Sequence, residues 1–455
     1  MNQKMILAII TTIIVVSAGA VYVISEDFVN KEEYDSKITD MAGRTVEYNS
    51  NPERIALLGP SALRLYCYAG DMDKLVGIES IEYEWGRFEG RPYMLAYKDY
   101  FETLKTDIGS GGPRGVPDFE KLLDADLDVL FTTQGMEVAE LDNLQNKIRT
   151  PVIKLSYGNN APFDEDIYRS MEIIGKVSGS QEKADNVINY IKGIKNDFNT
   201  RTADIPESER ATVYIGALSY GGAHGLESTT RSYNLFQELN IKNAYDEKLK
   251  ELNKDVGQEL HRVDWEFVQE VNPEYIVVDE GGLDLVRQNC ADFPQRYDNM
   301  NAFMNGNVVV QMSFNWYASN LEMILANGYF IGKTYYPEKF ADVDMKEKFD
   351  EITTNMLGKA LYDDVKKEYV YSFDTWNTKS HTVTYPGVSE DYVLEKGAEG
   401  SLFRGKEISF SVTPGEGKTV TVKVNGTEIE GTDGKYSFKL MGDSVISVET
   451  SSGGV

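Results

Sequence analysis

Short runs of apolar residues alternate with helix-like stretches along most of the chain, and this alternation predicts an α/β fold. Strands separated by helices in this way pair in parallel and are covered by helices on both faces of their sheet. The runs expected to be strands are residues 55–58, 75–78, 129–132, 152–155, 211–215, 275–278 and 308–310. The stretches expected to be helices are residues 61–69, 118–123, 232–239, 320–333 and 344–357.

The strongest helical pattern lies at residues 180–198. Ser180 is a residue type that caps helices, and Glu182 suits a first turn. A helix of this length is roughly 30 Å long, about the diameter of a domain. Its predicted buried face consists of Ala184, Val187, Ile188, Ile191, Ile194 and Phe198.

Two segments on either side of this helix resemble each other. Residues 116–131 and 262–278 each read as a short amphipathic helix that leads into a buried strand. Aligning them places Asp118 over Asp264 and Glu120 over Glu266, with Phe119 over Trp265 and Asp128 over Glu274. Two copies of one unit predict two similar lobes around a cleft, which we place at residues 38–160 and 201–380, with a connecting helical segment at 161–200.

The pattern changes at about His381. Residues 408–412, 420–424 and 445–448 alternate between apolar and polar positions, which predicts a small antiparallel β module at residues 381–455. Asn425-Gly426 separates two strand-like runs and is a strong hairpin signal. The same asparagine opens an Asn-Gly-Thr glycosylation sequon, but the turn interpretation is preferred.

Residues 1–25 are expected to be a signal sequence or a membrane anchor. Lys4 precedes an uncharged run at residues 5–24, with Ala18-Gly19-Ala20 as a possible cleavage site. The run is also long enough to span a bilayer, which takes about 20 residues. Both alternatives place the rest of the chain outside the cytoplasm, either secreted or anchored at the cell surface.

The amino-acid composition limits the classes of partner that the protein can bind. The 455 residues carry a formal net charge of -27, which argues against nucleic acid and against an anionic membrane surface. Only two cysteines occur, Cys67 and Cys290, and neither has a second metal ligand at suitable spacing. We expect both to be buried apolar residues, and we expect neither a cofactor nor a metal ligated by the protein itself.

No arrangement of residues predicts catalysis. None of the three histidines (His224, His261 and His381) stands in a nucleophile or zinc-protease motif, and the phosphate-binding GxxxxGK[ST] loop is absent. The sequence therefore predicts a protein that is not an enzyme. Residues 109–112 are glycine-rich and read either as a turn or as a place where the backbone approaches a ligand closely.

Candidate ligand-binding residues lie in loops that follow predicted strands, where an α/β sheet places its ligands. The loop at residues 58–61 opens a helix, so its amides are candidates for an anionic group. Aromatic rings together with a few cationic donors suit a bulky, partly charged ligand. The candidates are Ser61, Tyr83, Trp85, Arg91, Tyr93, Ser110, Tyr220, His224, Arg231, Trp316 and Tyr317.

Residues 38–79 carry the motifs of a known family. A D-x-x-G-R-x-V hairpin is followed by P-x-R-[IV] and by a G-x-x-D-x-[LIV]-V-G turn. This block resembles the opening of the iron-complex and cobalamin class (class III) of periplasmic binding proteins, and the resemblance extends weakly to residue 364. Residues 315–344 resemble archaeal members of that class. The motif residues are Asp40, Gly43, Arg44, Val46, Pro52, Arg54, Ile55, Gly70, Asp73, Leu75, Val76 and Gly77.

The resemblance implies two α/β lobes joined by a single long rigid helix, with the ligand held between them. It implies a protein that delivers a small-molecule metal chelate to the ABC permease and ATPase of an importer. Together with the N-terminal segment, which lies outside the resemblance, we expect a membrane-tethered monomer. Docking on the permease would use an exposed glutamate on each lobe, and the matching positions are Glu120 and Glu266. An iron chelate is the first expectation, with cobalamin, haem or an oxyanion as alternatives. A surface receptor without a transport role is a further alternative.

Overall fold

The computed structural model describes residues 34–452 except 85–89, 113–114, 160, 232, 258–259, 298, 377–380, 400–401, 403–406 and 441, together with two N-terminal strands. These strands, β1 (Ile13–Ser17) and β2 (Ala20–Ile24), pair antiparallel. Most of the predicted signal or anchor lies outside the described residues, so that prediction stays open. Among the helices that the structure describes, none is long and apolar enough to cross a membrane.

The N-terminal lobe is built on a parallel sheet of order β6-β5-β7-β8. Its strands are β5 (Ile55–Leu58), β6 (Leu75–Gly77), β7 (Val129–Thr132) and β8 (Val152–Lys154). Successive side chains of β5 enter different cores: Leu57 faces the centre of the molecule, and Leu58 faces the outer layer. The helices of this lobe are α1 (Ala62–Ala69), α2 (Ile81–Glu84), α3 (Pro92–Phe101), α4 (Phe119–Asp124) and α5 (Val138–Ile148), with the 3-10 turn η1 (Met72–Lys74).

The C-terminal lobe repeats this plan with the sheet order β11-β9-β13-β14-β15, in which only the edge strand β15 is antiparallel. Its strands are β9 (Thr212–Gly216), β11 (Lys242–Asn243), β13 (Tyr275–Asp279), β14 (Val308–Gln311) and β15 (Asp374–Thr375), and β10 (Ser228–Thr230) pairs with β12 (Leu260–Arg262) beside it. Its helices are η2 (Glu207–Glu209), α8 (Asn234–Glu238), α9 (Ala244–Glu251), α10 (Trp265–Val271), η3 (Glu280–Gly282), α11 (Leu283–Asp292), α12 (Pro294–Tyr297), α13 (Asn301–Met304), α14 (Leu321–Tyr335), α15 (Met345–Leu357) and α16 (Tyr362–Val365).

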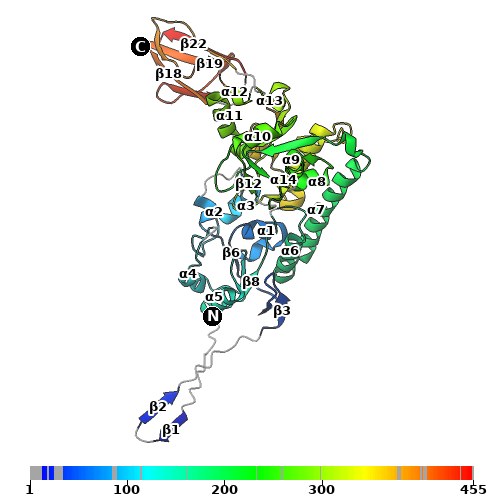
Figure 1. The fold of residues 1–455 in the computed structure, drawn as a ribbon. Coiled ribbons are helices and arrows are strands. Elements are labelled where there is room, and N and C mark those ends of the chain that lie inside the picture. The colour runs from blue at the N-terminus through cyan, green and yellow to red at the C-terminus, as the bar shows by residue number, and fades with distance from the viewer. Residues whose placement is uncertain are drawn as a thin grey trace.

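Two consecutive helices, α6 (Glu165–Ser178) and α7 (Gln181–Thr202), connect the lobes (Figure 1). The predicted apolar face of the long helix is buried along its whole length. The predicted cap is wrong in one respect: the Ser180 hydroxyl does not bond to the helix but donates to the Ala69 carbonyl at 2.6 Å. Ser180 therefore ties the helix start to the end of α1.

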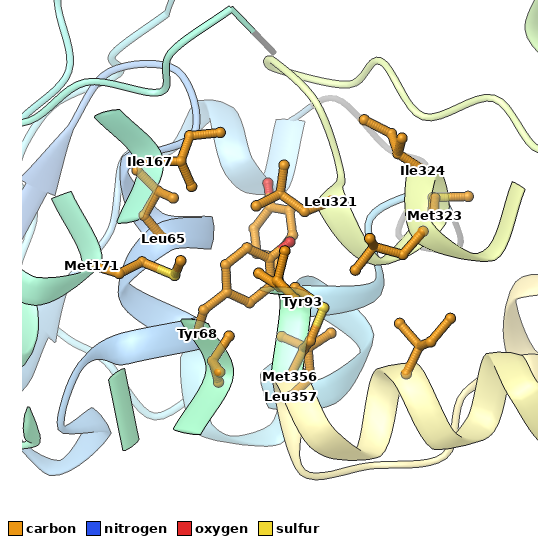
Figure 2. Close-up of a cluster of buried hydrophobic side chains, with 14 of the residues drawn as sticks. Leu65, Tyr68, Tyr93, Ile167, Met171, Leu321, Met323, Ile324, Met356 and Leu357 are labelled. Atoms are coloured by element: carbon orange, nitrogen blue, oxygen red, sulfur yellow. The ribbon is translucent and has the colours of Figure 1, made fainter. Parts of the chain in front are cut away.

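One apolar core runs through both lobes. Side chains from α1, α3 and α6 of the N-terminal side meet side chains from α14 and α15 of the C-terminal side (Figure 2). Leu65 and Met171, for example, belong to the same buried cluster as Met323 and Met356. The two lobes are therefore fastened together by packing. Cys67 lies in this core as predicted, whereas the prediction fails for Cys290 of α11, which is only partly buried because α11 lies at the outer face of its lobe.

The D-x-x-G-R-x-V motif forms the hairpin of β3 (Ser36–Thr39) and β4 (Thr45–Tyr48). The buried Asp40 carboxylate accepts from the backbone amides of Ala42, Arg44 and Lys154 and from the Arg44 guanidinium at 2.8 Å. Gly43 adopts a φ of 76°, which glycine tolerates without strain. Because Lys154 belongs to β8, this one carboxylate anchors the hairpin to the sheet.

The C-terminal residues form a β module with its own apolar core, including Ile408, Val412 and Ile446. Its sheets have the orders β16-β22-β19-β20 and β17-β18-β21, and every pairing is antiparallel except β16 with β22. Asn425 and Gly426, with φ of 48° and 81°, form the predicted hairpin turn. The strands are β16 (Val383–Thr384), β17 (Tyr392–Glu395), β18 (Glu407–Pro414), β19 (Lys418–Val424), β20 (Thr427–Glu428), β21 (Lys435–Lys439) and β22 (Ser444–Ser452).

Candidate ligand-binding site

The loops at the carboxyl ends of the two sheets meet between the lobes. The amide of Ser61, in the loop after β5, donates to the Tyr317 carbonyl at 3.1 Å. Tyr317 lies in the loop after β14, and its neighbour Asn315 donates to the carbonyl of Ser219 in the loop after β9 at 2.7 Å. The carboxyl edge of a parallel sheet is where α/β proteins bind ligands, so this junction is the candidate site.

The centre of the junction is the phenol of Tyr317. Its hydroxyl donates to Oε2 of Glu79 at 2.9 Å and accepts from the Gly112 amide at 3.0 Å. The other oxygen of Glu79 accepts from the Gly59 amide at 3.0 Å. Burial raises the pKa of Glu79 to about 8, so this carboxyl takes up a proton near neutral pH.

A buried arginine holds the other side of the junction. Arg64, on α1, has no solvent exposure (0%), and its Nε donates to Oδ1 of Asn320 at 3.0 Å. Its other nitrogens donate to the Ser61 hydroxyl and the Trp316 carbonyl. The guanidinium also stacks on the ring of Tyr93, 4.8 Å from the ring centre. Its Nη1 also lies 3.3 Å from the Tyr317 carbonyl, so Arg64 binds three groups of the C-terminal lobe in place of solvent.

Two further buried carboxyls complete this polar layer. Glu82 accepts from Arg91 at 2.8 Å and from the Tyr93 hydroxyl at 2.7 Å. Glu322 of α14 accepts from the Tyr68 hydroxyl of α1, which is a second polar link between the lobes. Burial raises the pKa of both carboxyls, and the Arg91 guanidinium opposes that shift at Glu82.

Four predicted ligand residues lie within this closed layer. Arg91, Tyr93, Ser61 and Tyr317 are 0%, 1%, 5% and 5% exposed. The loop at 58–61 was expected to offer its amides to an anion, but the structure differs because the Ser61 amide binds the Tyr317 carbonyl. The glycine-rich turn approaches protein closely, since a Cβ on Gly111 would clash with Oε1 of Glu79, and its approach to a ligand stays a prediction.

Other predicted residues are more exposed. Tyr83 is 37% exposed and Tyr220 is 64% exposed, while Ser110 is also exposed and Trp316 is partly buried. The Ser110 carbonyl accepts from the Ile81 amide, which holds the glycine-rich turn against α2. Trp85 lies outside the described residues. Arg231 is held elsewhere, by Asp246 at 3.2 Å and Asp255 at 2.8 Å.

An arginine beside His224, at this edge of the C-terminal lobe, was missed from the sequence. Nη2 of the exposed Arg262 lies 2.8 Å from Nε2 of His224, and the same ring nitrogen lies 3.0 Å from the Tyr220 carbonyl. Since arginine only donates, Nε2 accepts from Arg262 and cannot at the same time donate to the carbonyl. The signal was available, because Arg262 opens the second of the two similar segments, and it ends β12, which pairs with β10 a few residues after His224.

Two carboxyls stand at the end of β13. Asp279 accepts from the Gly281 amide at 3.0 Å, and Glu280 accepts from the Tyr371 amide at 3.0 Å and from the Ser372 hydroxyl. Burial raises the pKa of each to about 7. Within the described part of the chain, no group of three or more His, Cys, Asp or Glu side chains is placed to hold a metal ion.

The two similar segments form matching helices, α4 and α10, each followed by a central strand as predicted. Asp118 caps α4 by accepting from the Lys121 amide at 3.1 Å, and Asp264 caps α10 by accepting from the Phe267 amide at 2.8 Å. Glu120 and Glu266 occupy the second helical position in each case, and both are exposed. Each lobe therefore presents one carboxylate at an equivalent place.

Residues 55–311 match the profile of the family described as Periplasmic binding protein, so the chain belongs to that family. Membership confirms the predicted fold class and agrees with the prediction that the chain is not an enzyme. A curated relative is YvrC of Bacillus subtilis, named as an uncharacterized ABC transporter substrate-binding lipoprotein, which is 21% identical over 213 residues. That match covers 47% of this chain and 62% of the relative, which is less than two thirds of its length.

Several solved structures share the fold. Molybdate-bound MolA of Haemophilus influenzae is 18% identical with a TM-score of 0.55, covering 72% of this chain and 99% of that one. A periplasmic solute binding protein of Veillonella parvula is 19% identical with a TM-score of 0.56, covering 72% and 95%. CeuE of Helicobacter pylori with Ni(II) bound is 16% identical with a TM-score of 0.50, covering 74% and 99%.

Proposed function

We propose that this protein is the extracytoplasmic solute-binding component of an ABC importer. The observation that carries the proposal is the equivalent placement of Glu120 and Glu266 on Asp-capped helices of the two lobes. Two exposed carboxylates at matching sites suit contact with paired cationic groups on a two-fold partner. That partner is the permease of the importer, with its ATPase behind it.

We assign the ligand to the rim between the lobes. Tyr83 and Ser110 contribute from the N-terminal lobe, and Tyr220, Trp316 and the His224–Arg262 pair from the C-terminal lobe. Aromatic rings offer stacking faces, and an exposed guanidinium offers charge-assisted donors to an anionic group. This combination fits an anionic metal chelate with planar, unsaturated arms.

An iron chelate is the proposed cargo. Support comes from the resemblance of residues 38–79 to the iron-complex class of binding proteins. Residues 315–344 resemble archaeal members of the same class. Two of the structural relatives hold molybdate and Ni(II), so an oxyanion or another metal complex is the alternative. Cobalamin and haem are further alternatives, and the ligand screen described below includes both classes.

A ligand screen tests this proposal. Unfolding of residues 26–455 would be followed with ferric tris(catecholate), ferric tris(hydroxamate), haem, a corrinoid, nickel histidine and molybdate. A ligand at 100 times its dissociation constant raises the free energy of unfolding by about 2.7 kcal/mol. We expect a ferric chelate to raise the melting temperature. If molybdate or nickel histidine alone stabilises the protein, that ligand replaces the iron chelate as the proposed cargo. If none of the ligands stabilises it, the capture function is overturned.

A surface receptor without transport is the second candidate. The β module favours it, because the module lies outside the matched residues 55–311 and has a core of its own. A reconstituted importer distinguishes the two candidate functions. A solute-binding protein stimulates the transporter's ATPase, whereas a receptor binds the same chelate and leaves the ATPase activity unchanged.

A further inference from the structure

The loop that joins β14 to α14 is strained at its tip. Asn315 and Ser319 form an isolated antiparallel bridge, and the Trp316 amide donates to the Ala318 carbonyl at 2.9 Å. Between them Tyr317 and Ala318 adopt φ of 47° and 68°, a left-handed region that side chains other than glycine occupy at a cost. Contacts from outside the loop therefore help to offset the cost of two such residues in succession.

Those contacts come from the N-terminal lobe. The Tyr317 carbonyl accepts from the Ser61 amide at 3.1 Å and from Nη1 of Arg64 at 3.3 Å, at the first turn of α1. The Tyr317 phenol accepts from the Gly112 amide at 3.0 Å. A helix start with an arginine beside it and a glycine-loop amide opposite is an arrangement that binds anionic ligand groups. Here the tip's own oxygens occupy all three donors.

We propose that residues 315–319 are an internal plug, which fills the N-terminal half of the ligand cleft in the empty protein and is displaced by the bound chelate. The inference rests on the proposed function and concerns its regulation. Displacement would free the Ser61 amide, Arg64 and the Gly112 amide for the oxygens of the ligand, and it would release the left-handed conformation of Tyr317 and Ala318. The rim residues Trp316 and Tyr83 would then border one continuous site.

A plug lowers the apparent affinity of the ligand, because only the fraction of molecules with the plug open can bind. Tyr317→Phe weakens the closed state selectively. It removes the hydroxyl that binds Glu79 and Gly112, but it keeps the ring and the backbone carbonyl. Loss of about one net hydrogen bond shifts the equilibrium about fivefold, so the variant should bind the chelate about fivefold more tightly. If Tyr317 were a direct ligand contact, the same variant would bind more weakly.

The experiment uses the full chain labelled with 5-fluorotryptophan and read by fluorine NMR. The four tryptophans are few enough to resolve, and Trp316→Phe assigns the resonance in the loop. The probe is ferric tris(catecholate), with its affinity measured by fluorescence quenching. Tyr68→Phe is the matched control, because it removes another phenol-to-carboxyl bond between the lobes, to Glu322, without touching the loop.

We expect the chelate to move the Trp316 resonance, Tyr317→Phe to move it towards the same position without ligand, and only Tyr317→Phe to bind more tightly. Binding of the chelate with an unmoved Trp316 resonance, or weaker binding by Tyr317→Phe, overturns the plug and leaves the proposed function standing. If neither the wild type nor Tyr317→Phe binds the chelate, the iron-chelate cargo fails and the plug fails with it, whereas the capture function is decided by the other ligands of the screen.

Discussion

The carboxylates of Glu120 and Glu266 occupy the same position on two Asp-capped helices, one on each lobe of the molecule. The capping aspartates, Asp118 and Asp264, each accept a bond from the third residue of their helix, so the two helix starts have the same construction. Charge alone at a helix start is common, since carboxylates there favour the helix dipole. Equivalence across two lobes is what singles out this pair.

Reversing both charges should separate docking from capture. In Glu120→Lys with Glu266→Lys, we expect chelate affinity within about twofold of wild type, because neither residue lies at the cleft rim. Stimulation of the importer ATPase should be lost, since like charges would face each other at the contact. Glu182→Lys is the matched control: Glu182 is also exposed in a first helical turn, on α7. A loss of chelate affinity in the double variant would contradict the docking assignment.

Removing the Asp40 carboxylate should be strongly destabilising. Asp40→Ala removes the buried carboxylate that accepts from Arg44 Nε and from the amides of Ala42, Arg44 and Lys154. We expect a loss of about 3 kcal/mol, the range for breaking a buried ion pair. Asp142→Ala is the control, because Asp142 binds the same arginine but its side chain is 55% exposed, and it should cost less than about 1 kcal/mol. Urea denaturation measures both, and equal effects would refute this role of Asp40.

Stability should fall as the pH rises through neutrality. Burial raises the pKa of Glu79 to about 8 and those of Asp279 and Glu280 to about 7, from ordinary values of 4.5, 3.8 and 4.5. The folded protein therefore holds protons that the unfolded chain has already released, so the free energy of unfolding decreases across this range. We expect the melting temperature to be higher at about pH 5.5 than at about pH 8.5, by about 2 °C or more.

Glu79→Gln distinguishes this explanation from general charge repulsion. Glutamine keeps an acceptor for the Gly59 amide but does not titrate, so the decrease between about pH 7 and pH 8.5 should become shallower. A slope identical to that of the wild type would show that Glu79 is not the group responsible.

Removing the β module should leave the lobes intact. Deleting residues 382–455 removes strands whose apolar side chains pack in a core separate from those of the lobes. We expect unchanged chelate affinity and a melting temperature of the remaining protein within about 2 °C of the original. Differential scanning calorimetry would measure this, and collapse of the main transition would mean that the module supports the lobes.

The parallel strands and the long helix could be predicted because burial leaves a direct pattern in sequence. All four residues of β5 are buried, since both faces of the sheet are covered, and this appears as the unbroken apolar run 55–58. The buried stripe of α7 likewise follows from helical spacing. Such elements depend on their own residues, so sequence alone locates them to within a few positions.

The candidate site was harder to predict, because its residues are defined by partners distant in the chain. Tyr317 and Glu79 are 238 residues apart, and no glycine marks the left-handed tip that brings them together. Arg231 directly follows β10 and Arg262 ends β12, the strand paired with it, yet Arg231 is held by Asp246, and only Arg262 is exposed beside His224. Loop position therefore indicates the region of the candidate site, but it does not indicate which cation is exposed there.

The core shared by both lobes also sets the distance between α4 and α10. Moving the lobes apart would expose Leu65, Met171 and Met323 to water, so the two helices are held at a fixed separation. A transporter that contacts both α4 and α10 meets the same spacing between them, whether the binding protein is empty or carries its ligand. The transporter must then recognise the loaded state by a change in the surface between these two helices, where the ligand is bound.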